Sequence, residues 1–402
     1  MADLLPVEQA LARILAAAQV MDVEHVSPFE APGRILAEPL SATRTQPPFH
    51  ASAMDGYAVR ATDVANLPAT LRIIGESAAG NRFPGRLERG EAVRIFTGAP
   101  LPEGADAIVI QENTTRAGDR VSVVDGIIDP AYVRHRGFDF QDGDSLIPRN
   151  VTLNARTVTL AAAMGHGSLP VRRRPKIALL ATGNELVLPG QPAGPDQIVC
   201  SNPFGLSALA RQAGADPEFL GIARDTREDI AIKVAMAKEA DILVTIGGAS
   251  VGDHDLVIPV LKEMGLELDF WRIAMRPGMP FIFGRLARQV VLGLPGNPVS
   301  SLICGRIFMV PLIRRMLGLD EPGFAMEQMP LAAPLSANGP RQHYMRATLE
   351  TTPDGRRAVS PVKSQDSSLL ATLASAAVLI VRAPNAGPLP AGAVVTVIHL
   401  DF

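Results

Sequence analysis

The sequence predicts a multidomain protein of the α/β plus β class, with a central α/β domain between two β-rich regions. Between residues 175 and 318, apolar β-branched runs alternate with helical patterns, which indicates a mostly parallel sheet with helices on both faces. On either side, short β-like runs are separated by Gly and Pro, as in small β domains. The length of 402 residues suits two to four domains, and the hydrophobic fraction of 47% is ample for their cores.

The amino-terminal half is expected to begin with a helix and to continue as a β-rich domain. Leu4, Leu11, Ile14 and Leu15 recur at helical spacing among charged residues, so residues 1–50 are assigned to a helical and linker segment. Residues 51–140 form the β-rich domain, and residues 141–174 return to the linker domain. The β-like runs are 71–74, 92–96 and 107–111, and a helix is expected from Thr157 to Met164.

The central α/β domain, residues 175–318, is expected to alternate strands with helices. Asp225 and Glu228 resemble a capping box at the start of one of these helices. The expected strands are 176–181, 219–223, 241–246, 280–284 and 289–294; the expected helices are 202–214, 225–240, a segment after Asp255, and 298–317. After a linker, residues 330–402 form a small β domain.

Composition excludes several classes of function. A net charge of −3 and an aromatic fraction of 4% argue against a nucleic-acid partner. Cys200 and Cys304 have no metal-ligand spacing and are expected to be buried apolar residues, in keeping with a reducing compartment. No apolar run approaches the roughly 18 residues of a membrane helix, and the first helix is not a signal peptide. We therefore expect a cytoplasmic protein without a membrane partner.

Three turns are expected to meet at the carboxyl ends of the parallel strands, where open α/β sheets bind ligands. They are 181–186, 247–255 and 294–301, and the second lies between a buried strand and a helix. Glycines there let backbone amides approach an anion closely, although any one such turn could be merely structural. The candidate phosphate or hydroxyl partners are Thr182, Gly183, Gly247, Gly248, Ser250, Gly252, Gly296, Asn297, Ser300 and Ser301.

Acidic residues on the same edge predict a divalent cation. Glu185, Asp253 and Asp255 would repel a phosphate unless a cation lay between them, and Mg²⁺ takes one or two carboxylates together with phosphate oxygens. Asp253 could equally cap the following helix. Arg272 and Arg276, on an expected turn over 270–280, could clamp anionic oxygens or could simply be exposed.

A further turn, Ser52 to Arg60, places Asp55 between small residues, and its spacing alone implies no chemistry. Together with four other motifs, however, this segment resembles a known family. The motifs are Ser52 to Arg60, Phe96-Thr97-Gly98-Ala99, Thr182-Gly183-Asn184-Glu185-Leu186, Gly247 to Gly252 and Leu294 to Ser300. In this order they resemble the molybdopterin molybdenumtransferase (MoeA) family, which includes the E domain of gephyrin, over essentially the whole chain.

The resemblance implies an enzyme of molybdenum cofactor biosynthesis. Members insert molybdate into adenylylated molybdopterin and release AMP with a divalent cation, here expected to be Mg²⁺. The family fold implies a homodimer, a central three-layer α/β domain similar to molybdopterin adenylyltransferase, and a carboxyl-terminal β barrel. Molybdopterin adenylyltransferase and molybdoenzyme maturation factors become the expected partners.

The resemblance also assigns roles to residues of this sequence. The implied catalytic residues are Asp55, Thr97, Asp139, Glu185, Asp225 and Asp255, of which Glu185, Asp225 and Asp255 are the implied metal ligands. Arg272, Arg276, Pro295, Pro298, Arg346 and Ser367 join the strand-end residues as substrate-binding residues. The chain departs from the family pattern at His50, Phe138, Arg272 and Met279, where members often carry Asp or Asn, Glu, Lys and Lys.

Two alternatives remain open at this point. A molybdopterin adenylyltransferase-like enzyme would share the central domain, but it would lack the two β-rich regions. A non-catalytic molybdopterin-binding scaffold would keep the fold without turnover. Neither the metal nor the choice between molybdate and tungstate follows from the sequence.

Overall fold

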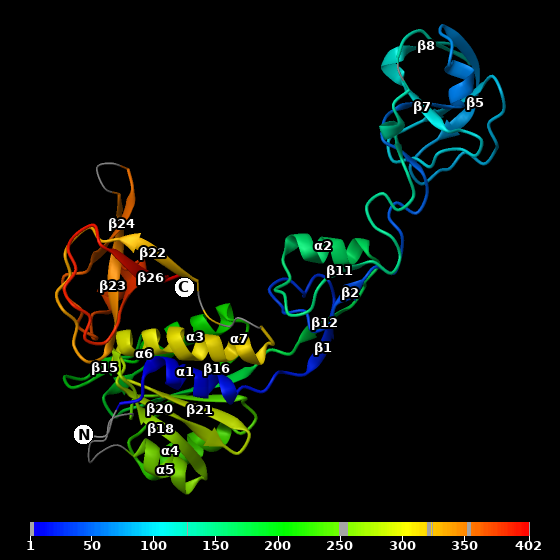
Figure 1. Cartoon of the computed structure of the whole chain (residues 1–402). Coiled ribbons are helices and arrows are strands. Elements are labelled where there is room, and N and C mark those ends of the chain that lie inside the picture. Colours follow the sequence, from blue (N-terminus) through cyan, green and yellow to red (C-terminus); the bar gives the residue numbers. More distant parts are fainter. Residues whose placement is uncertain are drawn as a thin grey trace. The chain divides into compact units, whose positions relative to one another are not determined.

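The computed structural model describes residues 4–126, 128–248, 256–319, 323, 325–351 and 355–401. The chain divides into two compact units (Figure 1). Unit 1 comprises Met1–Glu24, Gly33–Ala37 and Val171–Phe402, and unit 2 comprises His25–Pro32 and Glu38–Pro170. No helix in the described ranges is long and apolar enough to cross a membrane.

A six-stranded mixed sheet forms the centre of unit 1. In spatial order its strands are β16 (Asp216–Ala223), β13 (Lys176–Thr182), β17 (Ile242–Ile246), β21 (Gln289–Leu294), β20 (Pro280–Leu286) and β18 (Leu266–Arg272). The first four are parallel, whereas β20 is antiparallel to both β21 and β18. The expectation of parallel pairing therefore holds for four strands. The expectation of a turn over 270–280 was wrong in part, because residues 270–272 are the end of β18, in which apolar and polar residues alternate from Leu266 to Phe270.

Helices pack on both faces of this sheet (Figure 1). Alternate residues of β13 point to opposite faces, so Ile177 and Leu179 belong to one hydrophobic core and Ala178 and Leu180 to the other. The first core contains side chains of α1 (Val7–Ala16), α3 (Asn202–Gln212), α6 (Pro298–Cys304), the π-helical turn Gly305–Met309 and α7 (Val310–Met316). The second contains side chains of α4 (Arg227–Met236) and α5 (Val257–Glu263).

The start of α4 differs from the predicted capping box by one residue. Thr226 is the N-cap, and its hydroxyl oxygen accepts a hydrogen bond from the backbone N–H of Asp229 at 3.3 Å. The expected pair Asp225 and Glu228 therefore does not cap the helix. This shift matters, because it leaves the Asp225 carboxylate outside the helix and at the end of β16.

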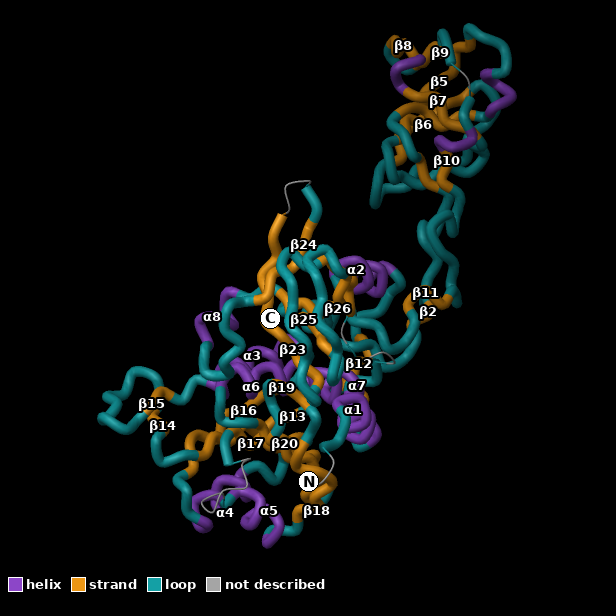
Figure 2. The backbone as a smooth tube through the Cα atoms, turned by 60° about the vertical axis from the view of Figure 1, so that its left-hand side comes forward, coloured by secondary structure: helices purple, strands orange, loops and turns teal. Residues whose placement is uncertain are grey.

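The carboxyl-terminal strands of unit 1 form a second sheet with its own core. Its strands are β19 (Met275–Arg276), β23 (Gln342–Thr351), β25 (Val378–Arg382), β26 (Val394–His399) and β22 (Met326–Pro330), with β24 (Arg357–Pro361) paired to β23. Tyr344, Leu379 and Ile398 reach from this sheet into the core formed with α3 and α6. The short helix α8 (Leu370–Ser375) lies next to α6 in Figure 2.

A narrow arm extends from the central domain between β13 and α3 (Figure 2). It consists of β14 (Leu186–Val187) and β15 (Ile198–Val199), which pair in parallel. Ile198 and Val199 are 59% and 48% exposed, so the arm presents apolar side chains to solvent.

Unit 2 contains a six-stranded β sheet. Its order is β7 (Ala107–Ile110), β4 (Gly56–Val59), β6 (Glu91–Ile95), β5 (Ala69–Ser77), β9 (Arg120–Val123) and β8 (Thr114–Ala117). Unit 2 also contains β2 (Leu40–Ser41), β3 (Ala51–Ser52), β10 (Val133–Arg134), β11 (Ser145–Ile147), α2 (Ala155–Ala163) and 3-10 helices at Ala61–Val64, Gln111–Asn113 and Pro130–Tyr132. The paired strands β1 (Val23–Val26) and β12 (Leu169–Arg172) contain residues of both units. The runs expected at 71–74, 92–96 and 107–111 and the helix expected at 157–164 are confirmed.

Candidate functional site

A cleft of about 800 Å³ lies at the carboxyl ends of β13, β17 and β21. All three expected strand-end turns contribute to it. Its lining includes the predicted residues Thr182, Gly183, Glu185, Asp225, Gly247, Gly248, Pro295, Gly296, Asn297 and Pro298. Parallel strands that end at one edge bring these turns together, as the strand-end rule requires.

The glycines of the cleft let the turns touch. The N–H of Gly247 donates to the carbonyl of Leu294 at 3.0 Å, which joins the turns after β17 and β21. A Cβ on Gly248 would lie 2.3 Å from Cγ2 of Val257, and its φ of +60° is in the left-handed region. The side-chain amide of Asn202 donates to the carbonyl of Gly296 at 2.7 Å. The turns are therefore fixed by close backbone contacts that larger residues would disrupt.

Two carboxylates project from the walls of the cleft. Glu185 folds back over Gly183, since a Cβ there would lie 2.5 and 2.6 Å from its carboxylate oxygens. Asp225 exchanges hydrogen bonds with Asn184: the backbone N–H of Asn184 donates to Oδ2 at 3.1 Å, and the N–H of Asp225 donates to the Asn184 side-chain oxygen at 3.2 Å. Both acids are exposed, and neither forms an ion pair with another described residue.

Part of the lining is apolar and comes from the arm. Leu186, Ile198 and Val199 line the cleft together with Cys200. Burial, followed by the nearby charge of Glu185, raises the pKa of the Cys200 thiol to about 11. The thiol is therefore protonated at neutral pH and adds to the apolar lining, as expected from the sequence.

Some predicted residues lie outside the described residues. These are Ser250, Gly252, Asp253 and Asp255, which follow Gly248 in the sequence. Among the described residues, no group of three or more His, Cys, Asp or Glu side chains could hold a metal ion. The described part of the cleft therefore supplies two of the three predicted metal ligands.

Other predicted residues are described but do not line the cleft. Ser300 and Ser301 are 4% and 0% exposed, because they face the core from the first turn of α6. Arg272 ends β18, and its guanidinium carbon lies 3.9 Å from the ring centre of Trp271. Arg276 lies on β19 opposite His343. Burial, followed by the charges of Arg276, Arg341, Arg346 and Arg382, lowers the pKa of His343 to about 4, so its imidazole is neutral at pH 7.

Arg346 and Ser367 belong to one assembly at the edge of the cleft. Arg346 is 1% exposed, and its guanidinium donates to the carbonyls of Ser364, Asp366 and Leu369 at 3.2, 2.9 and 3.1 Å. The Ser367 hydroxyl accepts from the side-chain amide of Asn297 at 3.0 Å. Arg346 thus holds the loop 364–369, which meets the turn after β21.

Unit 2 contains the remaining predicted residues. Oδ1 of Asp55 accepts hydrogen bonds from the backbone N–H and the hydroxyl of Thr97 at 2.8 and 2.9 Å. These bonds and the charge of Arg94 lower the pKa of Asp55. The structure thus brings Asp55 and Thr97 together, whereas Asp139 is exposed and its N–H donates to the carbonyl of Gln46 at 3.0 Å.

The departures from the family pattern have defined surroundings. Phe138 is 72% exposed. Nδ1 of His50 lies 3.2 Å from Nδ1 of His135, with the rings edge to face. The carbonyl of Met279 accepts a hydrogen bond from the N–H of Ile273 at 3.0 Å, so its backbone joins the ends of β18 and β20.

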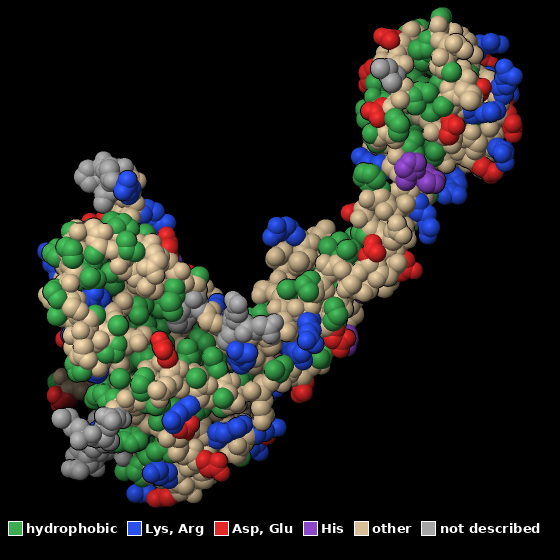
Figure 3. Space-filling view, viewed as in Figure 1, with side chains coloured by type: hydrophobic (Ala, Val, Ile, Leu, Met, Phe, Trp, Pro, Cys, Tyr) green, Lys and Arg blue, Asp and Glu red, His purple; other side chains and the backbone are tan. Residues whose placement is uncertain are grey.

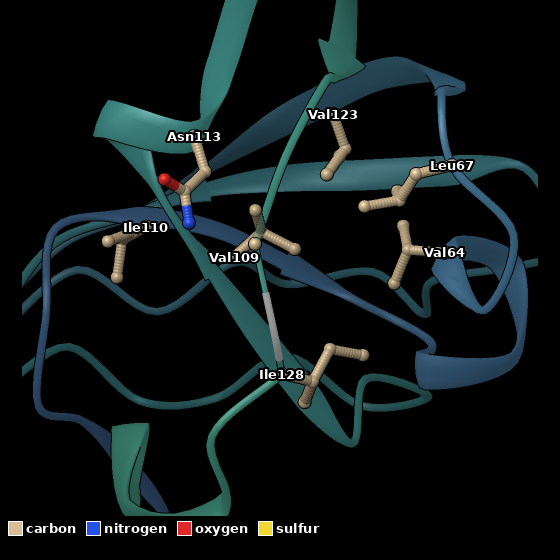
Figure 4. A pocket seen from close by; sticks show the side chains of 8 residues that line it. Val64, Leu67, Val109, Ile110, Asn113, Val123 and Ile128 are labelled. Carbon is tan, nitrogen blue, oxygen red and sulfur yellow. The ribbon is translucent and has the colours of Figure 1, made fainter.

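Two other features, a small cavity in unit 2 and the charge distribution on one face, do not suggest a second binding site. The cavity shown in Figure 4 lies in the β-rich sheet among Val64, Val109, Val123 and Ile128, and its volume of about 10 Å³ is room for roughly one water molecule. On the face shown in Figure 3, acidic and basic side chains are interspersed. That face offers no extended patch of one sign for a nucleic acid.

Comparison with known proteins places this cleft in a family. Three family models match consecutive regions: the MoeA N-terminal region (domain I and II) over residues 5–165, a probable molybdopterin binding domain over 178–315, and the MoeA C-terminal region (domain IV) over 328–400. The molybdopterin molybdenumtransferase of Nostoc sp. is 38% identical over 339 residues, which are 82% of this chain and 77% of that protein. The chain belongs to the molybdopterin molybdenumtransferase family.

Two further comparisons extend this relation over almost the whole chain. The molybdopterin molybdenumtransferase of Haemophilus influenzae is 34% identical and covers 93% of each chain. The crystal structure of the molybdopterin biosynthesis MoeA protein of Pyrococcus horikosii superposes with a TM-score of 0.87 at 30% identity, covering all of both chains. The resemblance seen in the sequence motifs is therefore confirmed, and the chain has the multidomain fold of this family.

Several cleft residues could not be identified from the sequence. Asn202 was interpreted only as a helix start, although an Asn-Pro pair at a strand-to-helix connection could also have indicated a strand-end residue. Ile198, Val199 and Ser368 gave no signal, because their position depends on the arm and on the loop 364–369 folding back to the cleft.

Proposed function

We propose that the chain inserts molybdate into adenylylated molybdopterin and releases AMP, as a molybdopterin molybdenumtransferase. One observation supports this proposal most directly: a single cleft combines three glycine-containing strand-end turns with two exposed carboxylates and an apolar wall. The turns suit a pyrophosphate, the wall suits a flat ring, and the carboxylates suit a cation. The membership of the family supports the same reaction.

The residues of the cleft fit a magnesium ion. Glu185 and Asp225 offer carboxylate oxygens without a protein cation to neutralise them among the described residues. Mg²⁺ prefers such oxygen ligands and keeps several waters. When bound, it would offset the negative charge on the phosphate that leaves with AMP. We propose Asp255 as the third ligand.

The chain itself contributes binding and orientation. Backbone groups of the turns at Gly183, Gly247 and Gly296 form the floor on which the phosphates are proposed to lie. Asn184 positions Asp225 through the two hydrogen bonds described above, of which one is to Oδ2, and we propose that Oδ1 binds the cation. We propose that Arg272, Arg276, Arg346, Ser300 and Ser367 bind or position the oxyanion, and we propose catalytic roles for Asp55, Thr97 and Asp139 of unit 2.

An assay of AMP release tests this function. The protein is incubated with adenylylated molybdopterin and Mg²⁺, with and without micromolar molybdate. AMP release that requires molybdate supports the proposal. Formation of adenylylated molybdopterin from ATP would instead indicate an adenylyltransferase, and binding without turnover would indicate a scaffold.

The finer architectural expectations belong to the same proposal. We propose a homodimer in the cytoplasm, the five-part division at residues 1–50, 51–140, 141–174, 175–318 and 330–402, and a three-layer central domain similar to molybdopterin adenylyltransferase. We also propose that the second sheet of unit 1 is a β barrel. A parallel bridge between Leu331 and Val359 supports this, because it joins the end of β22 to β24. Molybdopterin adenylyltransferase and molybdoenzyme maturation factors are the proposed partners.

A further inference from the structure

In the loop 364–369, the hydroxyl of Ser368 can act only as a hydrogen-bond acceptor toward the cleft, because its proton is used within the loop. Ser368 lines the cleft and is exposed. Its hydroxyl donates to Oδ1 of Asp366 at 2.7 Å, and its backbone N–H donates to the same oxygen at 2.8 Å. An ionised carboxylate only accepts hydrogen bonds, so the single proton of the Ser368 hydroxyl is committed to Asp366.

Asp366 is held in the ionised form that this arrangement needs. The two hydrogen bonds from Ser368 lower the pKa of Asp366, and the nearby charge of Arg346 acts in the same direction. At neutral pH the Ser368 oxygen therefore offers only lone pairs to the cleft.

The loop that carries this pair is firmly positioned. Gln365 accepts a hydrogen bond from the N–H of Arg346 and donates to its carbonyl, both at 2.9 Å, so its side chain extends the edge of β23. Arg346 in turn donates to the carbonyl of Asp366 at 2.9 Å. Ser368 is thus presented to the cleft from a fixed backbone, as a specificity residue requires.

Because the Ser368 oxygen can only accept a hydrogen bond, it favours a ligand group that can donate one. Phosphate and molybdate oxygens are themselves acceptors, so they gain no hydrogen bond from the Ser368 oxygen. A neutral group with a hydrogen to donate is attracted. The ligand of the proposed function has such groups on its two amino-substituted nitrogen heterocycles, the adenine and the pterin. The apolar wall at Ile198 and Val199 lines the same cleft and suits a flat ring.

We propose that Ser368, oriented by Asp366, is a specificity-determining residue that accepts a hydrogen bond from an N–H group on a heterocyclic ring of the ligand. This inference rests on the proposed function, because that function supplies the ring. It adds one hydrogen-bond acceptor to the cleft: the phosphates lie at the glycine turns and the amino edge of a ring lies at Ser368, whereas Arg346 and Ser367 remain with the oxyanion.

Paired ligands that differ in one donor test the inference. The full chain, in Mg²⁺, is titrated calorimetrically with AMP and with purine riboside 5′-monophosphate, which lacks only the exocyclic amine. A second pair is 6-hydroxymethylpterin and its lumazine counterpart, in which oxygen replaces the 2-amino group. Wild-type protein is expected to prefer the amino member of one pair by roughly 3- to 10-fold, the worth of one hydrogen bond.

The variants identify the residue responsible. In Ser368→Ala the preference is expected to disappear, and in Asp366→Asn it is expected to shrink because the amide can donate to the serine oxygen. Ser375→Ala removes an exposed hydroxyl on α8 whose bond is to the carbonyl of Thr372, and it should keep the full preference. The pair that loses its preference identifies the adenine or the pterin as the ring that Ser368 contacts.

Other outcomes would overturn the inference. One is a preference that survives in Ser368→Ala for both pairs, and another is no preference in the wild-type protein. A change in Ser368→Ala confined to the Mg²⁺ requirement, or to discrimination against 2′-deoxy-AMP, would assign the serine to a cation or to the ribose instead. Molybdate-dependent AMP release by the same wild-type preparation shows separately whether the proposed function holds.

Discussion

At the scale of single residues, the two carboxylates of the cleft differ in how they are held. Asp225 is joined to Asn184 by two hydrogen bonds, whereas the exposed Glu185 lies over Gly183. Because Asp225 is exposed, its role is expected to be chemical and not structural.

Replacing Asp225 by Asn tests that role. The side chain keeps its size but loses the charge that a cation needs, so AMP release is expected to fall by roughly 10²-fold or more. The free energy of unfolding should change by less than about 0.5 kcal/mol. Glu228→Gln removes a neighbouring exposed charge and serves as the control, with activity unchanged. Full activity of Asp225→Asn across a Mg²⁺ titration would remove Asp225 from the metal site.

Gly248→Ala tests the close packing of the turn after β17. The added Cβ would lie 2.3 Å from Cγ2 of Val257 at a φ of +60°, so unit 1 is expected to lose about 2 kcal/mol of stability. Gly392→Ala has a φ of +83° with open space and should lose only about 1 kcal/mol. Gly339→Ala has neither constraint and should lose nothing measurable. Equal midpoints of urea unfolding for the three variants would contradict the packing argument.

The residues found from the sequence are those that the strand-end rule locates. Thr182, Gly183 and Gly247 directly follow or end apolar runs, so their meeting at one edge could be predicted. Arg276 was also expected to bind the ligand, but it does not line the cleft. It lies on the two-residue strand β19, which pairs with β23, a strand distant in sequence. No local pattern reveals such a pairing.

At the scale of elements, the starts of β13 and β17 are tied together at the edge opposite the cleft. Arg173 donates to both oxygens of Asp241 at 2.9 and 3.0 Å, and the N–H of Lys176 donates to Oδ2 at 2.8 Å. Partial burial raises the pKa of Asp241, but the bonds from Arg173 and Lys176 outweigh it and the net shift is downward.

Asp241→Asn tests this tie through its pH dependence. A folded pKa below the usual value of about 3.9 means that the tie contributes stability above that pH and loses it as the pH falls through the folded pKa. The variant is therefore expected to be about 1–2 kcal/mol less stable at pH 7, with the difference shrinking below about pH 4. Glu239→Gln, in an exposed pair at 3.6 Å from Arg288, should have almost no effect. A difference that stays constant down to pH 2 would contradict the assignment.

At the scale of the whole molecule, the two units have separate hydrophobic cores. Unit 1 is built around Ile177, Leu179 and their neighbours, and the β-rich sheet of unit 2 around Tyr57, Val59 and theirs. Trp271, the single tryptophan of the chain, lies in unit 1 and therefore reports on that unit alone.

Gly56→Ala tests whether the units unfold separately. A Cβ at Gly56 would lie 2.0 Å from the carbonyl oxygen of Val109, so unit 2 is expected to lose about 3 kcal/mol. Circular dichroism should then show an earlier transition, while the midpoint of Trp271 fluorescence stays unchanged. Gly167→Ala has open space in the same unit and should shift neither signal. A matching shift of both signals would mean that the units unfold as one.

The overall class of the fold could be predicted because long apolar runs determine it. Strands β13, β17 and β21 are almost wholly buried and carry that signal. The antiparallel strand β18 was not predicted, although Leu266, Leu268 and Phe270 alternate with Glu267 and Asp269 as in a strand with one exposed face. Its pairing with β20 could not be predicted from this local pattern. The arm β14–β15 could not be predicted either, since two-residue strands leave no periodicity.

The central claim is that the strand-end cleft of unit 1 holds the pyrophosphate-linked ligand. Hydrogen exchange of the full chain, measured with and without adenylylated molybdopterin and Mg²⁺, tests it most directly. The account predicts that the ligand slows exchange in the segments 181–186, 246–248 and 294–298. It predicts no such slowing at residues 173–176 and 241, which lie at the opposite edge of the sheet. Protection confined to segments away from the cleft, with these three unchanged, would contradict it.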